Sequence, residues 1–203
     1  MSAKDKINPP RESGLSFGLN FNQNITSVKG KVTVTIKKGV NGIERVLLEK
    51  DNIYTLDGGV LAAMQFSNGN RPLTHLAVGT GASGDSSSPD IPDARQRRLN
   101  VELERKEFSS VVYRDSNGNI SAVPTNVLDF TAVYQAAEAV GPLNEMGLIS
   151  MRDGQLRPVQ DVFPARDTTV DLNDFDVLVN YLTFPVINKP NGSVLAITWR
   201  LTF

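Results

Sequence analysis

The chain contains no cysteine and only one histidine, His75, among its 203 residues. The lack of cysteine excludes disulfides, thiol nucleophiles and thiolate metal sites together. His75 alone cannot complete a common zinc site, because no second imidazole and no thiolate is present to join it. We therefore expect packing and assembly to stabilise the fold, and we expect His75 to be a packed or surface side chain of a strand rather than a ligand or a base.

Charge of one sign and long apolar runs are also absent. The 21 basic and 22 acidic residues nearly cancel, and the pI is about 5.9, so electrostatics give no drive toward nucleic acid or an anionic membrane. No stretch approaches the roughly 18 consecutive apolar residues that would span a bilayer. The N-terminal run MSAKDKINPP lacks the apolar core of a secretory signal. These features predict a soluble protein made in a cytoplasm, without nucleic-acid or membrane partners.

Strand patterns dominate the rest of the chain. Val32, Val34 and Ile36 alternate with lysine and threonine, which is typical of a strand buried on one face. The turn-forming residues Gly39–Gly42 then lead into a second apolar run, Ile43–Leu48, so the two runs predict a hairpin. A second hairpin is predicted by the turn DSNGN, which separates two extended segments, Phe108–Tyr113 and Val127–Tyr134.

Further strands are predicted at Leu73–Val78, at Val170–Leu182 and at the C-terminal end. The last of these, Val194–Phe203, alternates clearly and should end on a buried phenylalanine. The residues expected on its buried face are Leu195, Ile197, Trp199, Leu201 and Phe203. Short strands separated by Gly, Asn and Pro turns predict a mainly β fold, an antiparallel β-sandwich with one short helix and an extended N-terminal arm.

The helix is predicted from Asp57 onward, where two glycines and the run VLAAMQF follow. The Asp57 carboxylate should cap it, with Val60, Leu61, Met64 and Ala63 facing inward. A second region, ARQRRLNVELERKEF, is ambiguous: Leu99 and Leu103 have helical spacing, but strand-like residues follow soon after. Helix and strand therefore both stay open there.

The domain organisation follows from the polar N-terminus. Residues 1–14 contain Pro9 and Pro10 and show no periodicity, which predicts an extended arm that is ordered only against a partner, if at all. Residues 15–203 should form a single β-sandwich domain, since the length and the 40% hydrophobic content suit one core.

Three sequence patterns suggest chemistry, and each has a simpler interpretation. Gly79–Gly84 matches GxGxxG, but the serines and prolines that follow do not begin the helix that a dinucleotide site needs. The acidic run Asp171–Asp176 lacks the glycine and distal glutamate of a calcium loop. Arg95, Arg97 and Arg98 precede three glutamates, which favours salt bridges over nucleic-acid binding. We predict no catalytic, cofactor-binding or metal-binding residues. The three glutamates are Glu102, Glu104 and Glu107.

Several short segments occur in an order that resembles tailed-bacteriophage virion structural proteins. The segments are the turn AVGTG at Ala77–Gly81, a Leu, Glu and Arg at three-residue steps (Leu99, Glu102, Arg105), NE-x-GL at Asn144–Leu148, an LFAR-like piece at Val162–Arg166 and a closing strand at Ile197–Phe203. The likeness covers about Val28–Phe203. This chain departs from the pattern in the loop before Leu99, where the segment IPDARQRR stands in place of a shorter segment that begins with threonine.

The resemblance implies a non-enzymatic virion structural protein that assembles as repeated copies onto the particle, as a tail, baseplate or fibre-attachment component or as a capsid decoration protein. Its partners would be copies of itself and other virion proteins, and it would need no small-molecule substrate and no cofactor. Gly79 and Gly81 would turn the chain where a side chain would clash, and Glu102, Arg105 and Glu145 would form polar pairs at the sheet edge or between subunits.

Two rival functions stay open at this point, as do the position on the particle and the oligomeric state. One is a carbohydrate- or receptor-binding module of a phage tail, in which an aromatic side chain stacks on sugar. The other is an enzyme that uses Gly79–Gly84 for a nucleotide or Asp171–Asp176 for calcium. The aromatic candidates are Tyr54, Tyr113, Tyr134 and Trp199.

Overall fold

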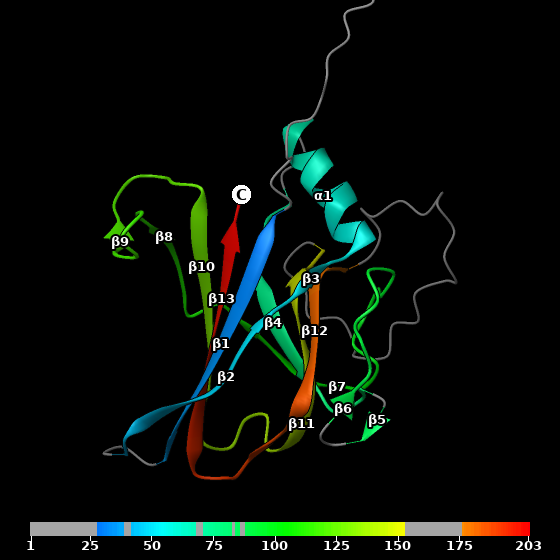
Figure 1. Cartoon of the computed structure of the whole chain (residues 1–203), viewed down its shortest axis with the longest axis vertical. Coiled ribbons are helices and arrows are strands. Elements are labelled where there is room, and N and C mark those ends of the chain that lie inside the picture. The colour runs from blue at the N-terminus through cyan, green and yellow to red at the C-terminus, as the bar shows by residue number, and fades with distance from the viewer. Residues whose placement is uncertain (1–27, 39–41, 68–70, 83, 86–87, 153–175) are drawn as a thin grey trace, which may run out of the picture.

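The computed structural model describes residues 28–38, 42–67, 71–82, 84–85, 88–152 and 176–203. Two antiparallel sheets pack face to face and enclose the main core (Figure 1), which confirms the predicted β-sandwich. The predicted N-terminal arm and its boundary at residue 14 lie outside the described residues. Among the described residues, no helix is both long and apolar enough to cross a membrane.

The first sheet, sheet A, has the strand order β2-β1-β13-β10-β8-β9. The second, sheet B, has the order β3-β12-β11-β4-β7. Sheet A consists of β1 (Lys29–Lys38), β2 (Glu44–Asp51), β8 (Ser110–Arg114), β9 (Ile120–Ser121), β10 (Val127–Tyr134) and β13 (Ser193–Thr202). Sheet B consists of β3 (Ile53–Tyr54), β4 (His75–Gly79), β7 (Glu102–Glu107), β11 (Gly141–Ser150) and β12 (Val177–Lys189). A separate short pair is formed by β5 (Gly84–Asp85) and β6 (Ser88–Pro89), and the helix is α1 (Leu56–Phe66).

The sequence correctly predicted five strands of sheet A, namely β1, β2, β8, β10 and β13, but it gave no indication of the short strand β9. Val32, Val34 and Ile36 of β1 are buried, and β1 pairs with β2 in the predicted hairpin. The residues of that turn, 39–41, lie outside the described residues. The predicted pairing of the two segments around the second turn is confirmed, since β8 pairs with β10 in antiparallel register, but the turn DSNGN itself joins β8 to the short strand β9. In the turn after β8, the Asp115 side chain accepts two backbone N–H groups.

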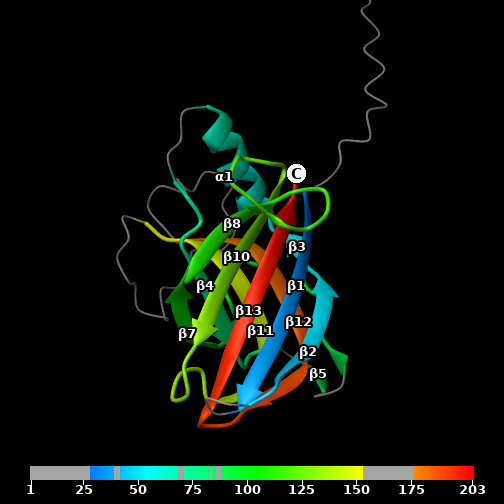
Figure 2. The ribbon, with the colours of Figure 1, turned by 90° about the vertical axis from the view of Figure 1, so that its left-hand side faces the viewer.

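β13 is an inner strand of sheet A and lies between β1 and β10 (Figure 2). Its four predicted core side chains are all buried. The prediction of a buried terminal phenylalanine was wrong, because Phe203 is 52% exposed. The strand ends at Thr202, opposite the beginning of β1, so Phe203 lies past the last strand pair at an open end of the sandwich. The four core residues are Leu195, Ile197, Trp199 and Leu201.

Sheet B is buried on both faces. Leu76 and Leu148 face the main core, whereas Ala77 and Ile149 pack on the opposite face in a second cluster with Leu99. Burial on both faces explains why β11 and β12 contain continuous apolar runs without strict alternation. The predicted strand at Leu73–Val78 is β4, shifted slightly along the chain, and β12 begins at Val177; residues 170–175 lie outside the described residues.

The helix is where the sequence predicted it, but Asp57 is not its cap. The N-cap is Thr55, whose Oγ1 accepts the Gly58 N–H at 2.9 Å and donates to the Leu178 carbonyl at 2.5 Å. Thr55 directly follows β3, so the end of that strand determines where the helix begins. Leu61 and Met64 face inward as predicted, whereas Val60 (51% exposed) and Ala63 face solvent.

The ambiguous segment before Phe108 becomes a strand in its second half, and its first half, residues 94–101, forms turns and irregular structure. The second half is β7, which pairs with β4 along the edge of sheet B, and no helix forms there. Leu99 is buried against the outer face of sheet B, whereas Leu103 is exposed. The two leucines therefore do not lie on one buried face, as they would on a helix. Edge pairing with β4 therefore outweighed the local helical pattern.

Candidate functional site

A buried carboxylate organises the end of sheet B. Glu145, on the inner strand β11, is fully inaccessible to solvent. Its Oε1 accepts the backbone N–H groups of Gly81 and Val101, each at 2.9 Å. Its Oε2 accepts the Asn100 N–H at 2.9 Å and the Tyr181 hydroxyl at 2.7 Å. These four donors occupy the four lone-pair positions of the carboxylate, so the buried charge is compensated and no position remains for a ligand.

Tyr181 is held as a donor in this centre. Burial raises the pKa of Tyr181 well above its ordinary value of 10.0, and the negative charge of Glu145 raises it further. The phenol therefore stays protonated at any pH at which the protein is handled, and its O–H remains directed at Glu145. The arrangement is a fixed hydrogen-bonding centre rather than an acid–base pair.

The glycines of the AVGTG turn approach this carboxylate closely. A Cβ at Gly79 would lie 2.5 Å from the Val101 carbonyl oxygen and 2.7 Å from Glu145 Oε1. A Cβ at Gly81 would lie 2.3 Å from the Val101 nitrogen. The prediction that side chains would clash at these positions is confirmed. The clash arises because the backbone at the end of β4 lies directly against residues 100 and 101.

A test of this close approach is Gly81→Ala. We expect the free energy of unfolding to fall by about 1–3 kcal/mol, because the added methyl group must displace backbone and the hydrogen bonds to Glu145. Gly59→Ala is the matched control, since nothing lies within 4 Å of a Cβ there and removing a helix glycine should raise stability by about 0.5–1 kcal/mol. Urea unfolding of both variants checks the prediction, which fails if Gly81→Ala is as stable as the unaltered chain.

The residue before Glu145 clamps the same loop. The Asn144 side-chain amide donates to the Ala82 carbonyl at 2.9 Å and accepts the Ala82 N–H at 3.1 Å. This pair of bonds imitates the pairing of one strand residue with another. Two successive residues of β11 therefore hold the chain that leaves β4.

Arg105 forms a second polar cluster on the edge strand β7. Its guanidinium binds both oxygens of Glu102, at 2.5 and 2.8 Å, and Oδ2 of Asp176 at 2.7 Å. The predicted pairing of Glu102 with Arg105 at a sheet edge is confirmed. The placement of Glu145 with them was wrong, because Glu145 lies on an inner strand and binds backbone groups instead. Such bidentate pairing is the geometry by which arginine compensates two nearly buried carboxylates.

Of the two candidate sites for a metal ligand, His75 lies among the described residues, whereas Asp171–Asp176 does so only at its last residue. That residue, Asp176, binds Arg105 and the Arg152 N–H. Within the described ranges, no group of three His, Cys, Asp or Glu side chains could hold a metal ion. His75 is a packed strand residue, only 3% exposed, and burial lowers its pKa against the opposing effect of Glu107.

The arginine run forms salt bridges, but not with the glutamates that follow it. Arg95 pairs with Asp93 at 2.9 Å, and Arg97 pairs with Asp57 at 2.8 Å. Asp57, predicted to be the helix cap, thus joins the first turn of α1 to the loop before β7. Of the three glutamates, Glu102 binds Arg105 and Glu104 accepts the Ala139 N–H.

Gly79–Gly84 is not followed by a helix. The chain leaves β4 and continues into the two-residue strands β5 and β6, and α1 precedes this segment in the sequence. Without a helix N-terminus at the glycines, the segment lacks the feature that binds a pyrophosphate. Among the four aromatic candidates for sugar stacking, Tyr134 and Trp199 are completely buried, and the Tyr134 hydroxyl donates to the Leu76 carbonyl.

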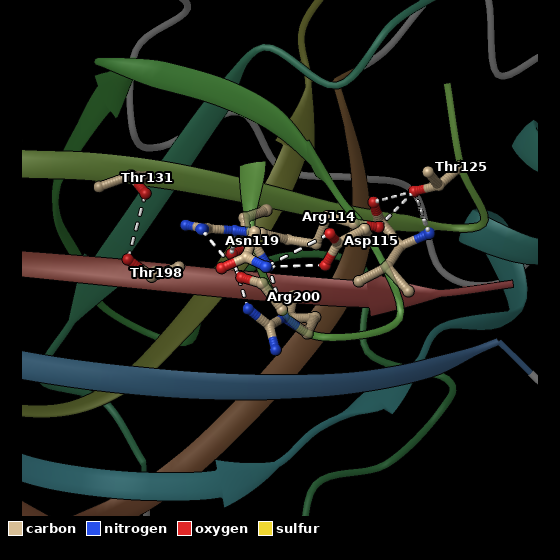
Figure 3. A network of polar contacts seen from close by, with 10 residues as sticks. Arg114, Asp115, Asn119, Thr125, Thr131, Thr198 and Arg200 are labelled. Atoms are coloured by element: carbon tan, nitrogen blue, oxygen red, sulfur yellow. Dashed lines mark hydrogen bonds and ion pairs between the residues drawn. The ribbon is translucent and has the colours of Figure 1, made fainter. Parts of the chain in front are cut away.

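A third polar cluster, which the sequence did not reveal, lies on the outer face of sheet A. Asp129 on β10 accepts Nε and Nη2 of Arg200 at 2.7 and 2.9 Å and Nε of Arg114 at 2.8 Å. Figure 3 shows Arg200 and Arg114 converging on one side of the sheet. Further along the same strands, the Thr131 and Thr198 hydroxyls are 3.1 Å apart. These contacts link three adjacent strands across the face that points away from the core.

This cluster predicts a pH effect. Burial alone would raise the pKa of Asp129, but hydrogen bonds and charge from Arg200 and Arg114 outweigh it and lower the pKa below its ordinary value of 3.8. Because the folded-state pKa is depressed, the stabilisation is present above that ordinary value and is lost as the pH falls through the folded-state pKa. Asp129→Asn should therefore be less stable than the unaltered chain at pH 7, and the difference should shrink below about pH 4.

Urea midpoints at pH 7, 5, 4 and 3 measure this difference. Asp51→Asn is the control, since it makes the same chemical change at an exposed side chain of β2. A constant difference between Asp129→Asn and the unaltered chain from pH 7 to pH 3 would show that the arginine pairs do not stabilise the fold.

Comparison with known proteins adds no assignment, since neither the protein-family models nor the curated proteins include a match to this chain.

Proposed function

We propose that this chain is a non-enzymatic structural protein of a tailed-bacteriophage particle and that it assembles there as repeated copies. The observation that supports the proposal most directly is where the resembling segments meet. The AVGTG turn, Leu99 and NE-x-GL come from separate parts of the chain, yet they converge around the Glu145 carboxylate and the adjoining outer face of sheet B. The LFAR-like segment, Val162–Arg166, lies outside the described residues.

The use of the charged groups also supports a structural role. Glu145, Arg105 and Asp129 are the centres of the three clusters, and each is occupied by hydrogen bonds that join separate strands. Catalytic groups need access to substrate, whereas the hydrogen-bonding positions of these side chains are occupied by other parts of the sandwich. A rigid scaffold of this kind is suited to a part that is fixed in a symmetric assembly.

The edge of sheet A offers a surface for such assembly. β2 is the terminal strand of the sheet and is eight residues long, so one row of its backbone groups is unpaired within the sheet. Val46 on this strand and Ile43 just before it are both exposed. An open edge with apolar side chains can accept a strand of another protein. This supports partners among further copies and other virion proteins.

Labelling of particles tests the proposal. Antibodies against the purified chain are applied with gold to tailed particles released from the strain that carries its coding sequence, and the same gradient fractions are analysed by peptide mass spectrometry. We expect label at a regular position and more than one copy per particle. Pre-immune serum is the control. Expression of the chain in the cell without its presence on the particles would contradict the proposal.

A further inference from the structure

An apolar groove opens at one end of the sandwich. It has a volume of about 490 Å³ and is walled by both sheets and by α1. Phe66 on α1 is 93% exposed, and Val111 and Phe203 at the same groove are about half exposed. Apolar side chains gathered in this way mark a binding surface. The residues that line it include Leu61, Phe66, Leu73, Val111, Leu128 and Phe203.

The chain enters the sandwich beside this groove. Lys29, the first residue of β1, pairs with Thr202, so the residue before it lies next to Phe203. Val28 itself packs against the main core. Figures 1 and 2 both place α1, the C-terminus and the beginning of β1 at the same end of the molecule. The 27 residues that precede Val28 are therefore joined to the fold at the rim of the groove.

Those 27 residues contain a single dense apolar stretch, Leu15–Phe21, with the sequence LSFGLNF. Its large apolar residues occur at every second position, separated by serine, glycine and asparagine. In an extended conformation this period of two places all four on one face. The four residues are Leu15, Phe17, Leu19 and Phe21.

The connection between this stretch and Val28 is short. Residues 22–27 form a hexapeptide, polar except for Ile25, that when fully extended spans about 20 Å. That reach is enough for the stretch to return to the groove of its own chain. Covalent linkage of this length gives an effective concentration on the order of millimolar, far above that of a free second copy at micromolar protein. The groove of the same chain is therefore the favoured place for it to bind.

We propose that Leu15–Phe21 occupies the groove between α1 and the open end of the sandwich of its own chain. Its apolar face covers Phe66, Val111 and Phe203, and the polar residues between face solvent. The proposal is independent of the proposed function: it concerns how one copy completes its core, and the arm of residues 1–14 then leaves the domain from this end.

Cysteine cross-linking tests the proposal, because the chain has no cysteine of its own. Ala62 and Gln65 of α1 line the groove. Ala62→Cys or Gln65→Cys is combined in turn with Leu15→Cys, Phe17→Cys, Leu19→Cys or Phe21→Cys, since a disulfide forms only when the two Cα atoms come within about 7 Å. Oxidation of the full-length chain is followed on non-reducing gels and by mass spectrometry at 1 and 50 µM, roughly a fiftyfold range of concentration.

We expect at least one of these pairs to form a disulfide within a single chain, to the same extent at both concentrations. Thr35→Cys, which lies on the outer face of sheet A away from the groove, replaces the α1 cysteine in the control and should give at least tenfold less cross-link. Unfolding midpoints confirm that each variant folds. Cross-linking no greater than this control overturns the proposal, and so does cross-linking only between chains, which would show that a second copy fills the groove.

Discussion

Replacing Glu145 with glutamine is expected to lower the free energy of unfolding by about 3 kcal/mol. The carboxylate accepts three backbone N–H groups and one hydroxyl, and both of its oxygens are used. Glutamine offers one acceptor oxygen, and its NH₂ group would face at least one backbone N–H donor that it cannot bind. At least one buried backbone N–H group then loses its acceptor. Because the site excludes water, no solvent molecule replaces that acceptor.

Chemical denaturation of the Glu145→Gln variant measures the effect. Glu44→Gln makes the same chemical change at an exposed position of β2 and should alter stability by less than about 0.5 kcal/mol. Tyr181→Phe removes only the hydroxyl donor and should cost about 1 kcal/mol. If Glu145→Gln were as stable as Glu44→Gln, the carboxylate would not organise the end of sheet B as described above.

Deleting Trp199–Phe203 is expected to abolish cooperative folding. These residues form the last half of β13, which hydrogen-bonds to β1 on one side and to β10 on the other. The deletion removes Trp199 and Leu201 from the core and leaves Val32 and Phe130 without their neighbour. Loss of Trp199 alone should cost about 3–5 kcal/mol, which is comparable to the total stability of many domains.

Removal of Phe203 alone is the matched control for this deletion. Phe203 lies beyond the last strand pair and is half exposed; its N–H donates to the Asn126 carbonyl, and its carbonyl accepts from the Asn126 side-chain amide. The chain ending at Thr202 should therefore still melt cooperatively, with a midpoint lowered far less than by loss of the β13 core residues. Thermal melts followed by circular dichroism distinguish the two truncations. A soluble, cooperatively melting chain that ends at Thr198 would show that β13 is dispensable.

Elements that are determined by residues close together in the sequence could be predicted from the sequence. The alternation in β1 and β13 specified which side chains are buried, because successive side chains of a strand point to opposite faces. The pairing of β1 with β2 and the turn after β8 could be predicted from the glycines and asparagines between the apolar runs, because these residues adopt turn conformations easily. These local rules were sufficient for the antiparallel sandwich, and the absence of cysteine and the single histidine limited the chemistry that the fold could support.

Tertiary contacts decided the rest. Glu145 acquires its role from donors at residues 81, 100, 101 and 181, which only the folded sheet brings together. Thr55 rather than Asp57 caps α1 because β3 ends there, and residues 102–107 form a strand because the edge of β4 supplies a partner. The sequence by itself determined the strands β1, β2, β8, β10 and β13 and the buried faces of β1 and β13, through local sterics and periodicity. Only the folded structure determined which distant groups meet, because no local pattern records which backbone donors a buried charge will bind.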